Sequence, residues 1–259
     1  MEDQLKVAII QSNLIWEKPK KNRKLFSEKI ESIITPVDLI VLPEMFTSGF
    51  TMNAAAVAET MDGKSVEWMK KMALQTGVAI VGSLIIQEAG KFYNRLLFVE
   101  PSGLITTYNK RHTFTLAGED KVFSAGSEKV IVEYKGWKIC PLVCYDLRFP
   151  VWARNTEDYD ALIYVANWPK PRILPWDILL KARAIENMCY VIGVNRVGLD
   201  EAENEYTGHS AVYDVLGNPV TILRPNKEHI EIAVLDRHHI TYYRNKLKFL
   251  DDKDAFILT

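Results

Sequence analysis

The chain has 259 residues, of which 48% are hydrophobic and 25% are charged. This composition is typical of a globular protein and argues against long disordered segments. The formal net charge is −1, so no excess of charge favours nucleic acid or an anionic membrane surface as a partner. We therefore expect a small-molecule site.

The N-terminus, M-E-D-Q-L-K-V, lacks the basic and apolar regions of a secretory signal, and no apolar stretch approaches the ~20 residues that span a bilayer. We expect a cytoplasmic protein. The chain has three cysteines, Cys140, Cys144 and Cys189. They are too few for a disulfide framework, and an odd number cannot all pair with one another. The spacing of Cys140 and Cys144 does not resemble a zinc site, so we expect no bound metal.

Apolar patterns predict alternating strands and helices in the first half of the chain. Strands are expected at residues 5–11, 37–42, 78–87, 91–99 and 103–108, and amphipathic helices at residues 18–34 and 65–77. The first strand, first helix and second strand then form a βαβ unit. The last two of these strands are expected to pair antiparallel across a turn.

The second half continues this alternation. A hairpin is expected at residues 130–143, helices at 148–157 and 176–187, and strands at 161–166, 189–194, 208–213 and 231–235. No internal repeat or flexible linker divides the chain. We therefore expect a single domain over residues 1–259, with a layered α/β fold of mixed sheets and outer helices.

Residues 238–259 form a C-terminal extension that returns to a high apolar and aromatic content after the last expected strand. A solvated tail does not need such residues. The segment either packs back on its own domain or crosses to another subunit, and we favour a place at a dimer interface.

Cys144 is the candidate nucleophile. An apolar run at residues 137–143 predicts a buried strand, and Asp146 and Pro150 cannot continue it. Cys144 therefore lies at the end of a strand, where sites collect in α/β proteins and where a turn can direct a side chain and a backbone N–H at one point. The alternative is a buried structural cysteine, since free cysteine behaves as a small hydrophobe.

A thiol with a pKa near ~8.5 needs a base or a cation to become a nucleophile at neutral pH. None of the five histidines lies in a known cysteine-protease signature. Glu44 directly follows the strand at residues 37–42, at the same sheet edge as Cys144, and burial would raise its pKa toward that of a general base. The alternative for Glu44 is a solvated loop or a helix start.

Lys110 and Glu119 complete the candidate catalytic set. Lys110 follows the strand at residues 103–108; if it points inward, it can stabilise a thiolate and donate to an oxyanion. Glu119 lies nine positions later on a glycine-containing loop and can orient the lysine or a substrate amide. The alternative for both residues is a solvated surface.

Three motifs follow one another along the chain: L-P-E-M-F-T-S-G-F around Glu44, Y-N-K-R-H around Lys110 and V-C-Y-D-L-R-F-P around Cys144. In this order they resemble the Glu, Lys and Cys motifs of the nitrilase, or carbon–nitrogen hydrolase, superfamily. The later N-W-P, A-R-A-I-E-N, N-R-V-G-x-D and G-x-S segments are similar too, so the resemblance covers residues 5–235.

The resemblance implies a four-layer α-β-β-α sandwich, a homodimer or larger assembly, and a Glu-Lys-Cys site without metal or cofactor. Glu44 would take the proton of Cys144 and later activate water. Lys110 and the backbone N–H of Tyr145 would form the oxyanion hole. Glu119 matches a second, assisting glutamate of the family.

Within the family, the segments around Lys110 and Cys144 are most similar to the omega-amidase branch, which hydrolyses the terminal amide of 2-oxo acid monoamides. Such substrates carry a carboxylate, and Arg148 is our candidate to bind it. The alternative for Arg148 is an ion pair with Asp146. Phe46, Trp168 and Trp176 are candidate pocket walls, although aromatic residues are also common in the core.

Two other functions stay open. The chain can be another amidase of the superfamily, acting on N-carbamoyl amino acids or polyamines, and an acidic pocket wall would favour the polyamine. It can also be a catalytically silent binding module, but the presence of all three catalytic residue types disfavours that.

Overall fold

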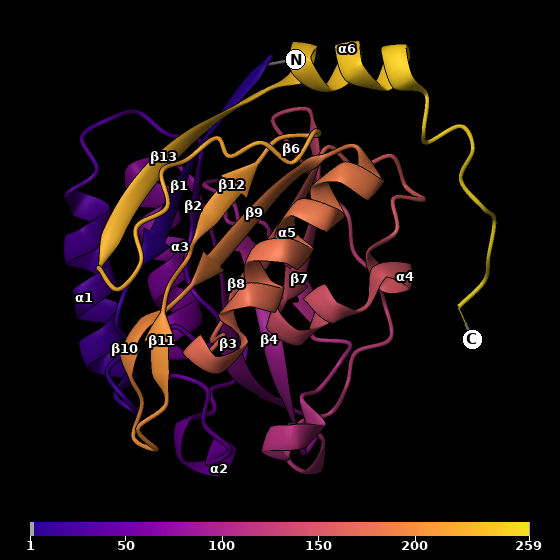
Figure 1. Ribbon diagram of the computed structural model, residues 1–259. Helices are drawn as coiled ribbons and strands as arrows, with labels where there is room; N and C mark the ends of the chain where they lie inside the picture. Colours follow the sequence, from indigo (N-terminus) through magenta and orange to yellow (C-terminus); the bar gives the residue numbers. More distant parts are fainter. Residues whose placement is uncertain (1–2, 259) are drawn as a thin grey trace.

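Two mixed β-sheets pack face to face in the computed structural model, which describes residues 3–258 (Figure 1). The first sheet has the strand order β13-β1-β2-β3-β4-β5. Its strands are β1 (Gln4–Gln11), β2 (Leu39–Val41), β3 (Ala79–Glu88), β4 (Lys91–Val99), β5 (Ile105–Asn109) and β13 (His229–Asp236). Strands β1, β2 and β3 are parallel, which confirms the predicted βαβ unit, and β4 and β5 form the predicted antiparallel pair.

The second sheet has the order β12-β9-β8-β7-β6. Its strands are β6 (Val132–Tyr134), β7 (Trp137–Val143), β8 (Ala161–Ala166), β9 (Tyr190–Asn195) and β12 (Ala211–Tyr213). Strands β7, β8 and β9 are parallel, and β6 and β7 form the predicted hairpin. A small sheet of β10 (Val197–Leu199) and β11 (Glu205–Thr207) was not predicted.

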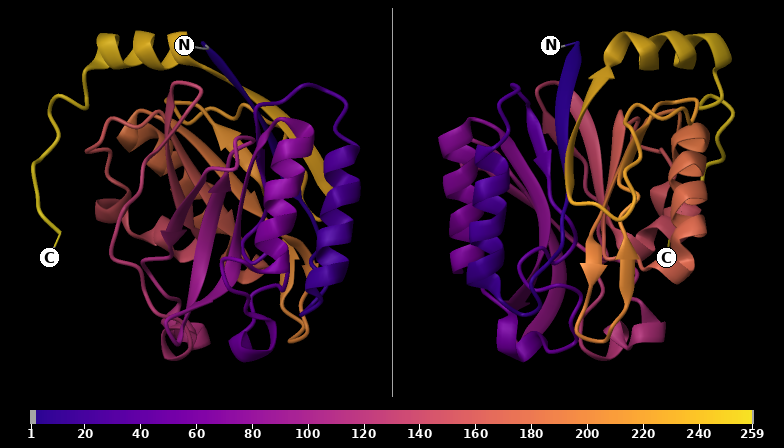
Figure 2. Two further views of the ribbon diagram at one scale, coloured as in Figure 1. Left: turned by 180° about the vertical axis from the view of Figure 1, so that it is seen from behind. Right: turned by 60° about the vertical axis from the view of Figure 1, so that its left-hand side comes forward.

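Helices cover the outer face of each sheet. Helices α1 (Pro19–Glu31) and α3 (Lys64–Thr76) lie on the first sheet, and α5 (Ile173–Asn187) lies on the second (Figure 2). Gly77 caps the C-terminus of α3, and its φ of 69° lies in the left-handed region that favours glycine. The four layers seen in Figure 2 match the sandwich that the family resemblance implies. Within residues 3–258, no helix is long and apolar enough to cross a membrane.

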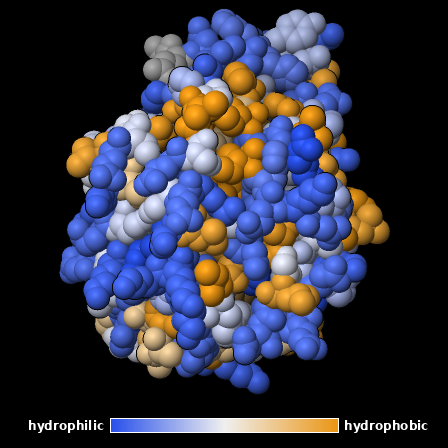
Figure 3. Space-filling model, turned by 90° about the vertical axis from the view of Figure 1, so that its left-hand side faces the viewer, coloured by the Kyte–Doolittle hydropathy of each residue, from blue (hydrophilic) through white to orange (hydrophobic). Residues whose placement is uncertain are grey.

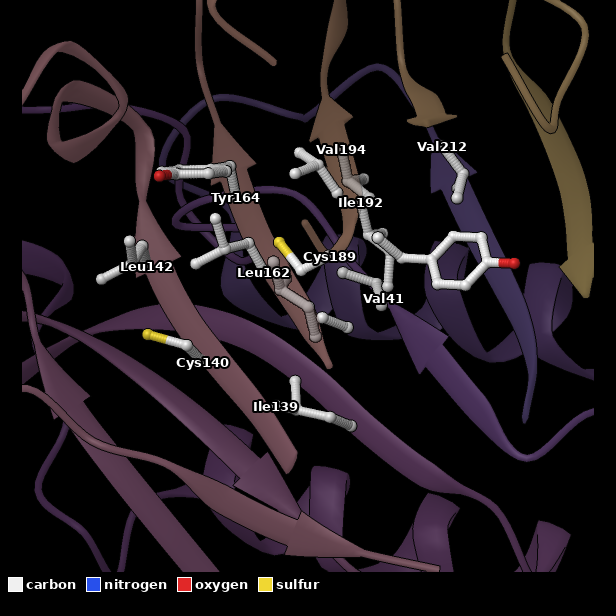
Figure 4. Packing of buried hydrophobic residues seen from close by; sticks show 14 of the residues in the cluster. Val41, Ile139, Cys140, Leu142, Leu162, Tyr164, Cys189, Ile192, Val194 and Val212 are labelled. Carbon is white, nitrogen blue, oxygen red and sulfur yellow. The ribbon is translucent and has the colours of Figure 1, made fainter. Parts of the chain in front are cut away.

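Apolar side chains from both sheets fill the space between them. Val41 of β2 and Leu142, Leu162 and Ile192 of the second sheet belong to one buried cluster (Figure 4). Cys140 and Cys189 lie in the same cluster, and burial raises the pKa of both thiols. Both thiols therefore stay protonated at neutral pH and behave as small hydrophobic residues. Outside this core, the face that bears α1 is mostly hydrophilic, with apolar side chains gathered in separate patches (Figure 3).

The helix predicted at residues 148–157 is wrong in length. A 3₁₀ helix covers Cys144–Arg148, and α4 covers only Pro150–Ala153. Pro150 lacks an N–H donor and keeps Phe149 outside helical geometry, with φ −113° and ψ 87°, while Arg154 is already extended. The two short helices are therefore separated at Phe149.

The C-terminal extension contains a helix that the sequence analysis missed, α6 (Arg237–Leu247). The Asp236 side chain accepts a hydrogen bond from the N–H of His238 and so caps the helix. Ile240 is buried, and Tyr243 and Leu247 pack against the main core. This part packs on its own domain; a role of the more distal residues in a dimer interface stays a prediction (Figure 1).

The packing between the helices and the first sheet gives a stability prediction. Phe26 of α1 is fully buried in the cluster under α1 and α3. We expect Phe26→Ala to lower the free energy of unfolding by about 3–5 kcal/mol, because it removes a large side chain and leaves a cavity. Urea denaturation measures this change. Leu74→Ala on α3, where the side chain is 71% exposed, is the control and should change stability by less than about 0.5 kcal/mol. Equal effects of both substitutions would contradict the assignment of this core.

Candidate active site

Glu44 and Cys144 both follow the carboxyl ends of parallel strands, β2 and β7. The loop after β8 contacts Glu44, because the backbone N–H of Asn167 donates to Glu44 Oε2 at 2.7 Å. Glu44 is fully buried, and Cys144 is 9% exposed. The expectation of a common sheet edge is wrong, because β2 belongs to the first sheet and β7 to the second; the two strand ends meet where the sheets pack together.

The backbone turns sharply at Cys144, which has a φ of 45°. Such left-handed geometry is unfavourable for a residue with a side chain, so the surrounding contacts must maintain it. The buried carboxylate of Asp146 does so, because its Oδ2 accepts the N–H of Val143 at 3.0 Å and the hydroxyl of Tyr108 at 2.7 Å. The strand therefore ends before Asp146, as the sequence analysis expected.

Lys110 joins the two glutamates. Its Nζ donates to Glu44 Oε1 at 3.0 Å and to both carboxylate oxygens of Glu119, at 3.0 and 2.9 Å. The side chains of all three residues are at most 1% exposed. The alternative of a solvated basic cluster is therefore wrong for Lys110, and the alternative of a solvated loop is wrong for both glutamates. We call these three residues the charged cluster.

Two asparagines that were not predicted hold the carboxylates in place. Asn94 Nδ2 donates to Glu44 Oε1 at 2.7 Å and to Glu119 Oε1 at 3.2 Å. Asn167 Nδ2 donates to the Glu44 backbone carbonyl at 2.7 Å. A polar residue inside the apolar strand β4 was the available signal for Asn94, and the N-W-P segment was the signal for Asn167.

Burial and neighbouring charges determine the resting protonation of the site. Burial raises the pKa of the Cys144 thiol, the Glu44 carboxylate raises it further, and Lys110 only partly offsets this. Burial disfavours the charge on Lys110, but Glu119 and Glu44 outweigh it, so the pKa of Lys110 lies above its usual range. At rest the site therefore holds a neutral thiol beside an ammonium group, and thiol ionisation requires transfer of its proton to a base.

A cavity of about 390 Å³ opens onto Cys144. Arg148 and Trp168, which were predicted to form the substrate pocket, line it, and so does Tyr145. The guanidinium carbon of Arg148 lies 4.9 Å from the centroid of the Trp168 ring. The alternative of an ion pair between Arg148 and Asp146 is not found among the described residues, because the Asp146 oxygens bind Tyr108, His112 and Val143 instead.

Two of the predicted pocket walls belong to the core. Phe46 is fully buried and packs against Phe26 and Trp68, with ring centroids 5.4 and 5.5 Å apart. Trp176 lies behind Trp168 at 5.5 Å and donates its indole N–H to the His209 carbonyl. The cavity is lined instead by aromatic residues that the sequence analysis did not select: Trp16, Phe50, Phe114 and Tyr206. Phe50 lies in the same motif as Glu44, which was the available signal.

Within residues 3–258, no three or more His, Cys, Asp or Glu side chains are grouped so that they could hold a metal ion. The charges of the described site come from Lys110, Glu44 and Glu119 near the thiol and from arginines on the cavity wall. Such an arrangement can perform nucleophilic and acid–base chemistry with the side chains alone.

Comparison with known proteins places the chain in a family. A family model described as carbon–nitrogen hydrolase matches residues 6–245. The chain is 46% identical over 254 residues to "Omega-amidase YafV" of Escherichia coli K12, covering 98% of each protein. It is 36% identical over 257 residues to "2-oxoglutaramate amidase" of Bacillus subtilis, covering 96% of this chain and 98% of that protein.

A solved structure is similar over the full length of both chains. It is a carbon–nitrogen hydrolase superfamily protein from Xanthomonas campestris with an arsenic adduct in its active site, 40% identical to this chain, with a TM-score of 0.97. Saccharomyces cerevisiae Nit3, a member of the nitrilase superfamily, matches with a TM-score of 0.85 and 25% identity, and the match covers 95% of each chain. The family model, the full-length relatives and the fold agree with the Glu, Lys and Cys motifs. The chain therefore belongs to the carbon–nitrogen hydrolase family.

Proposed function

We propose that this enzyme is an omega-amidase, a thiol-dependent amidohydrolase that cleaves the terminal amide of a small carboxylate-bearing substrate. 2-Oxoglutaramate or 2-oxosuccinamate would be converted to the acid and ammonia. The observation that carries the proposal is the buried charged cluster beside Cys144, on a cavity that also presents Arg148. The names of the full-length relatives support the choice of substrate.

Acylation begins with transfer of the Cys144 proton to Glu44. The negative charge of Glu44 raises the pKa of the thiol, so the proton must move to Glu44 itself, and the positive charge of Lys110 favours the resulting thiolate. The sulfur attacks the amide carbon, and the carbonyl π electrons move to its oxygen. When the tetrahedral intermediate collapses, the C–N bond breaks, Glu44 returns its proton to the leaving nitrogen, and ammonia departs from a thioester.

The oxyanion of that intermediate needs donors that are already in place. Lys110 Nζ is held by three hydrogen bonds to the glutamates, and the N–H of Tyr145 immediately follows the nucleophile. We assign both as oxyanion donors. Each such donor contributes about 3–4 kcal/mol of transition-state stabilisation.

Deacylation reverses the order of these steps. Glu44 takes a proton from water, and the hydroxyl attacks the thioester carbon. The C–S bond then breaks, and Glu44 returns the proton to Cys144. Glu119 assists by holding Lys110 and, through Asn94, by fixing the orientation of Glu44.

Charge on the cavity wall separates the alternative substrates. Arg148 favours an anionic amide, whereas a polyamine substrate needs an acidic wall. Asp200 is an acidic residue on this wall, and its oxygens accept hydrogen bonds from Asn204 and Tyr206. An N-carbamoyl amino acid also carries a carboxylate, so it stays the second candidate, and a silent binding module is the third.

We further propose that the enzyme acts in the cytoplasm as a homodimer or larger homo-oligomer. Three buried, unpaired cysteines are typical of a protein from a reducing compartment. Exposed apolar side chains on α5, namely Leu174, Ile178 and Ile185, and in the C-terminal segment support an interface between subunits.

The first test measures ammonia release from 2-oxoglutaramate. Cys144→Ala should lower kcat on the order of 10³-fold or more, because the covalent step is lost. Cys140→Ala is the matched control: it removes a thiol from the neighbouring strand and should retain turnover. Equal turnover by the wild type and Cys144→Ala would contradict the mechanism. Turnover of other amides alone would remove only the substrate assignment.

The second test separates thiol ionisation from base catalysis. Glu44 raises the pKa of Cys144 while Lys110 lowers it, so Glu44→Gln should lower this pKa. The pH midpoint for alkylation by iodoacetamide should therefore move down, although kcat falls by about 10²–10⁴-fold.

This alkylation is measured in a background of Cys140→Ala and Cys189→Ala, so that only one thiol reports. Full activity in Glu44→Gln would show that Glu44 is not the base. An alkylation midpoint that moves up would show that the Glu44 charge does not raise the pKa of Cys144.

A further inference from the structure

Arg172 is a second cation on the cavity wall, and no sequence motif pointed to it. It ends a 3₁₀ helix, Lys170–Arg172, directly before α5. Its guanidinium carbon lies 5.0 Å from the centroid of the Phe114 ring, which also lines the cavity. Among residues 3–258, no carboxylate forms an ion pair with Arg172. A stacked guanidinium keeps its in-plane N–H groups free to donate to a ligand.

Arg172 and Arg148 are linked through Trp168. The indole ring of Trp168 lies beneath the Arg148 guanidinium, and its N–H donates to the backbone carbonyl of Arg172 at 2.5 Å. Trp168 is 3% exposed and therefore has little freedom to move. The two arginines come from different helices but share one rigid support, and we call them the arginine pair.

The arginine pair gives the cavity wall an excess of positive charge. The charged side chains that line the cavity are Arg148, Arg172 and Asp200. The Asp200 carboxylate accepts hydrogen bonds from Asn204, Tyr206 and the N–H of Ala202, and these bonds lower its pKa. Because Asp200 is engaged within its own loop and pairs with neither arginine, the wall suits an anionic ligand.

Phe114 also connects the arginine pair to the catalytic centre. Its backbone N–H donates to Glu119 Oε2 at 2.5 Å, and Glu119 in turn holds Lys110. The ring that supports Arg172 and the charged cluster are therefore fixed by the same loop. An anion held by Arg172 has a defined position relative to Cys144, which also lines this cavity.

We propose that Arg172 is a specificity-determining residue that, together with Arg148, binds the carboxylate of the substrate between two guanidinium groups. The inference rests on the proposed amidase function and narrows it to amides that carry one carboxylate distant from the scissile amide. A guanidinium fork matches carboxylate geometry, and two of them select strongly against a neutral analogue.

The test compares Arg172→Gln with the wild type on two matched amides. 2-Oxoglutaramate carries the carboxylate, and 4-oxopentanamide has a methyl group in its place. We expect KM for 2-oxoglutaramate to rise by about 10- to 100-fold with little change in kcat, since a charge-assisted contact is lost away from the reacting atoms. KM for 4-oxopentanamide should stay the same. For Arg172→Lys, KM for 2-oxoglutaramate should lie between the values of the wild type and Arg172→Gln.

Lys170→Gln is the matched control for a general loss of positive charge. Lys170 is two residues away, outside the cavity lining, and pairs with Glu205 on the surface at 2.7 Å. This variant should behave as the wild type. If Arg172→Gln lowers activity equally on both amides, Arg172 has a structural role. If KM for 2-oxoglutaramate is unchanged in Arg172→Gln, Arg172 does not bind the carboxylate. Either result would overturn the inference.

A binding measurement keeps the inference separate from the proposed function. Titration calorimetry with 2-oxoglutarate, and with 4-oxopentanoate as the ligand that lacks the distal carboxylate, needs no turnover. Arg172→Gln should weaken only 2-oxoglutarate binding. A wild type that hydrolyses neither amide would remove the proposed function, whereas 2-oxoglutarate binding that is unaffected by Arg172→Gln would overturn the role of Arg172.

Discussion

The burial of one ammonium group between two carboxylates is the constraint on which the active site depends. An isolated charge in such a site costs several kcal/mol, and the cost is offset only when every partner is in place. Lys110 Nζ contacts both Glu44 and Glu119, and Asn94 donates to the same two carboxylates. Glu44 and Lys110 follow strands of the first sheet, and Asn94 lies within β4. The fold and the charged cluster therefore depend on each other. The sandwich can therefore not be altered near β2 or β4 without disturbing the chemistry.

The nucleophile is held in an unfavourable backbone conformation for a related reason. A φ of 45° at Cys144 ends strand β7 abruptly and brings the thiol to the cavity. Asp146 stabilises this turn by accepting the N–H of Val143. The same carboxylate accepts the hydroxyl of Tyr108, which lies two residues before Lys110 in the sequence. Because burial raises the pKa of the thiol and the Glu44 carboxylate raises it further, the proposed attack requires proton transfer to Glu44.

Local sequence signals predicted the strand ends and hence the positions of Glu44 and Cys144. They failed where orientation depends on residues distant in sequence. Phe46 follows Met45, whose φ of 44° turns the chain, and its side chain therefore enters the core under α1 instead of the cavity. Asn94 reaches Glu44 only because β3 and β4 pair in one register. Helix α6 was missed because His, Arg and Lys residues interrupt the apolar pattern of Arg237–Leu247, although Asp236 was an available N-cap signal.

The proposed mechanism requires that the substrate becomes covalently attached to Cys144. Rapid quenching in acid during turnover of 2-oxoglutaramate, followed by mass spectrometry of the intact protein and its peptides, tests it most directly. We predict an acyl adduct on the peptide that contains Cys144, absent from Cys144→Ala and retained in Cys140→Ala and Cys189→Ala. An adduct on Cys140 or Cys189 in place of Cys144, or an adduct that persists in Cys144→Ala, would contradict this mechanism.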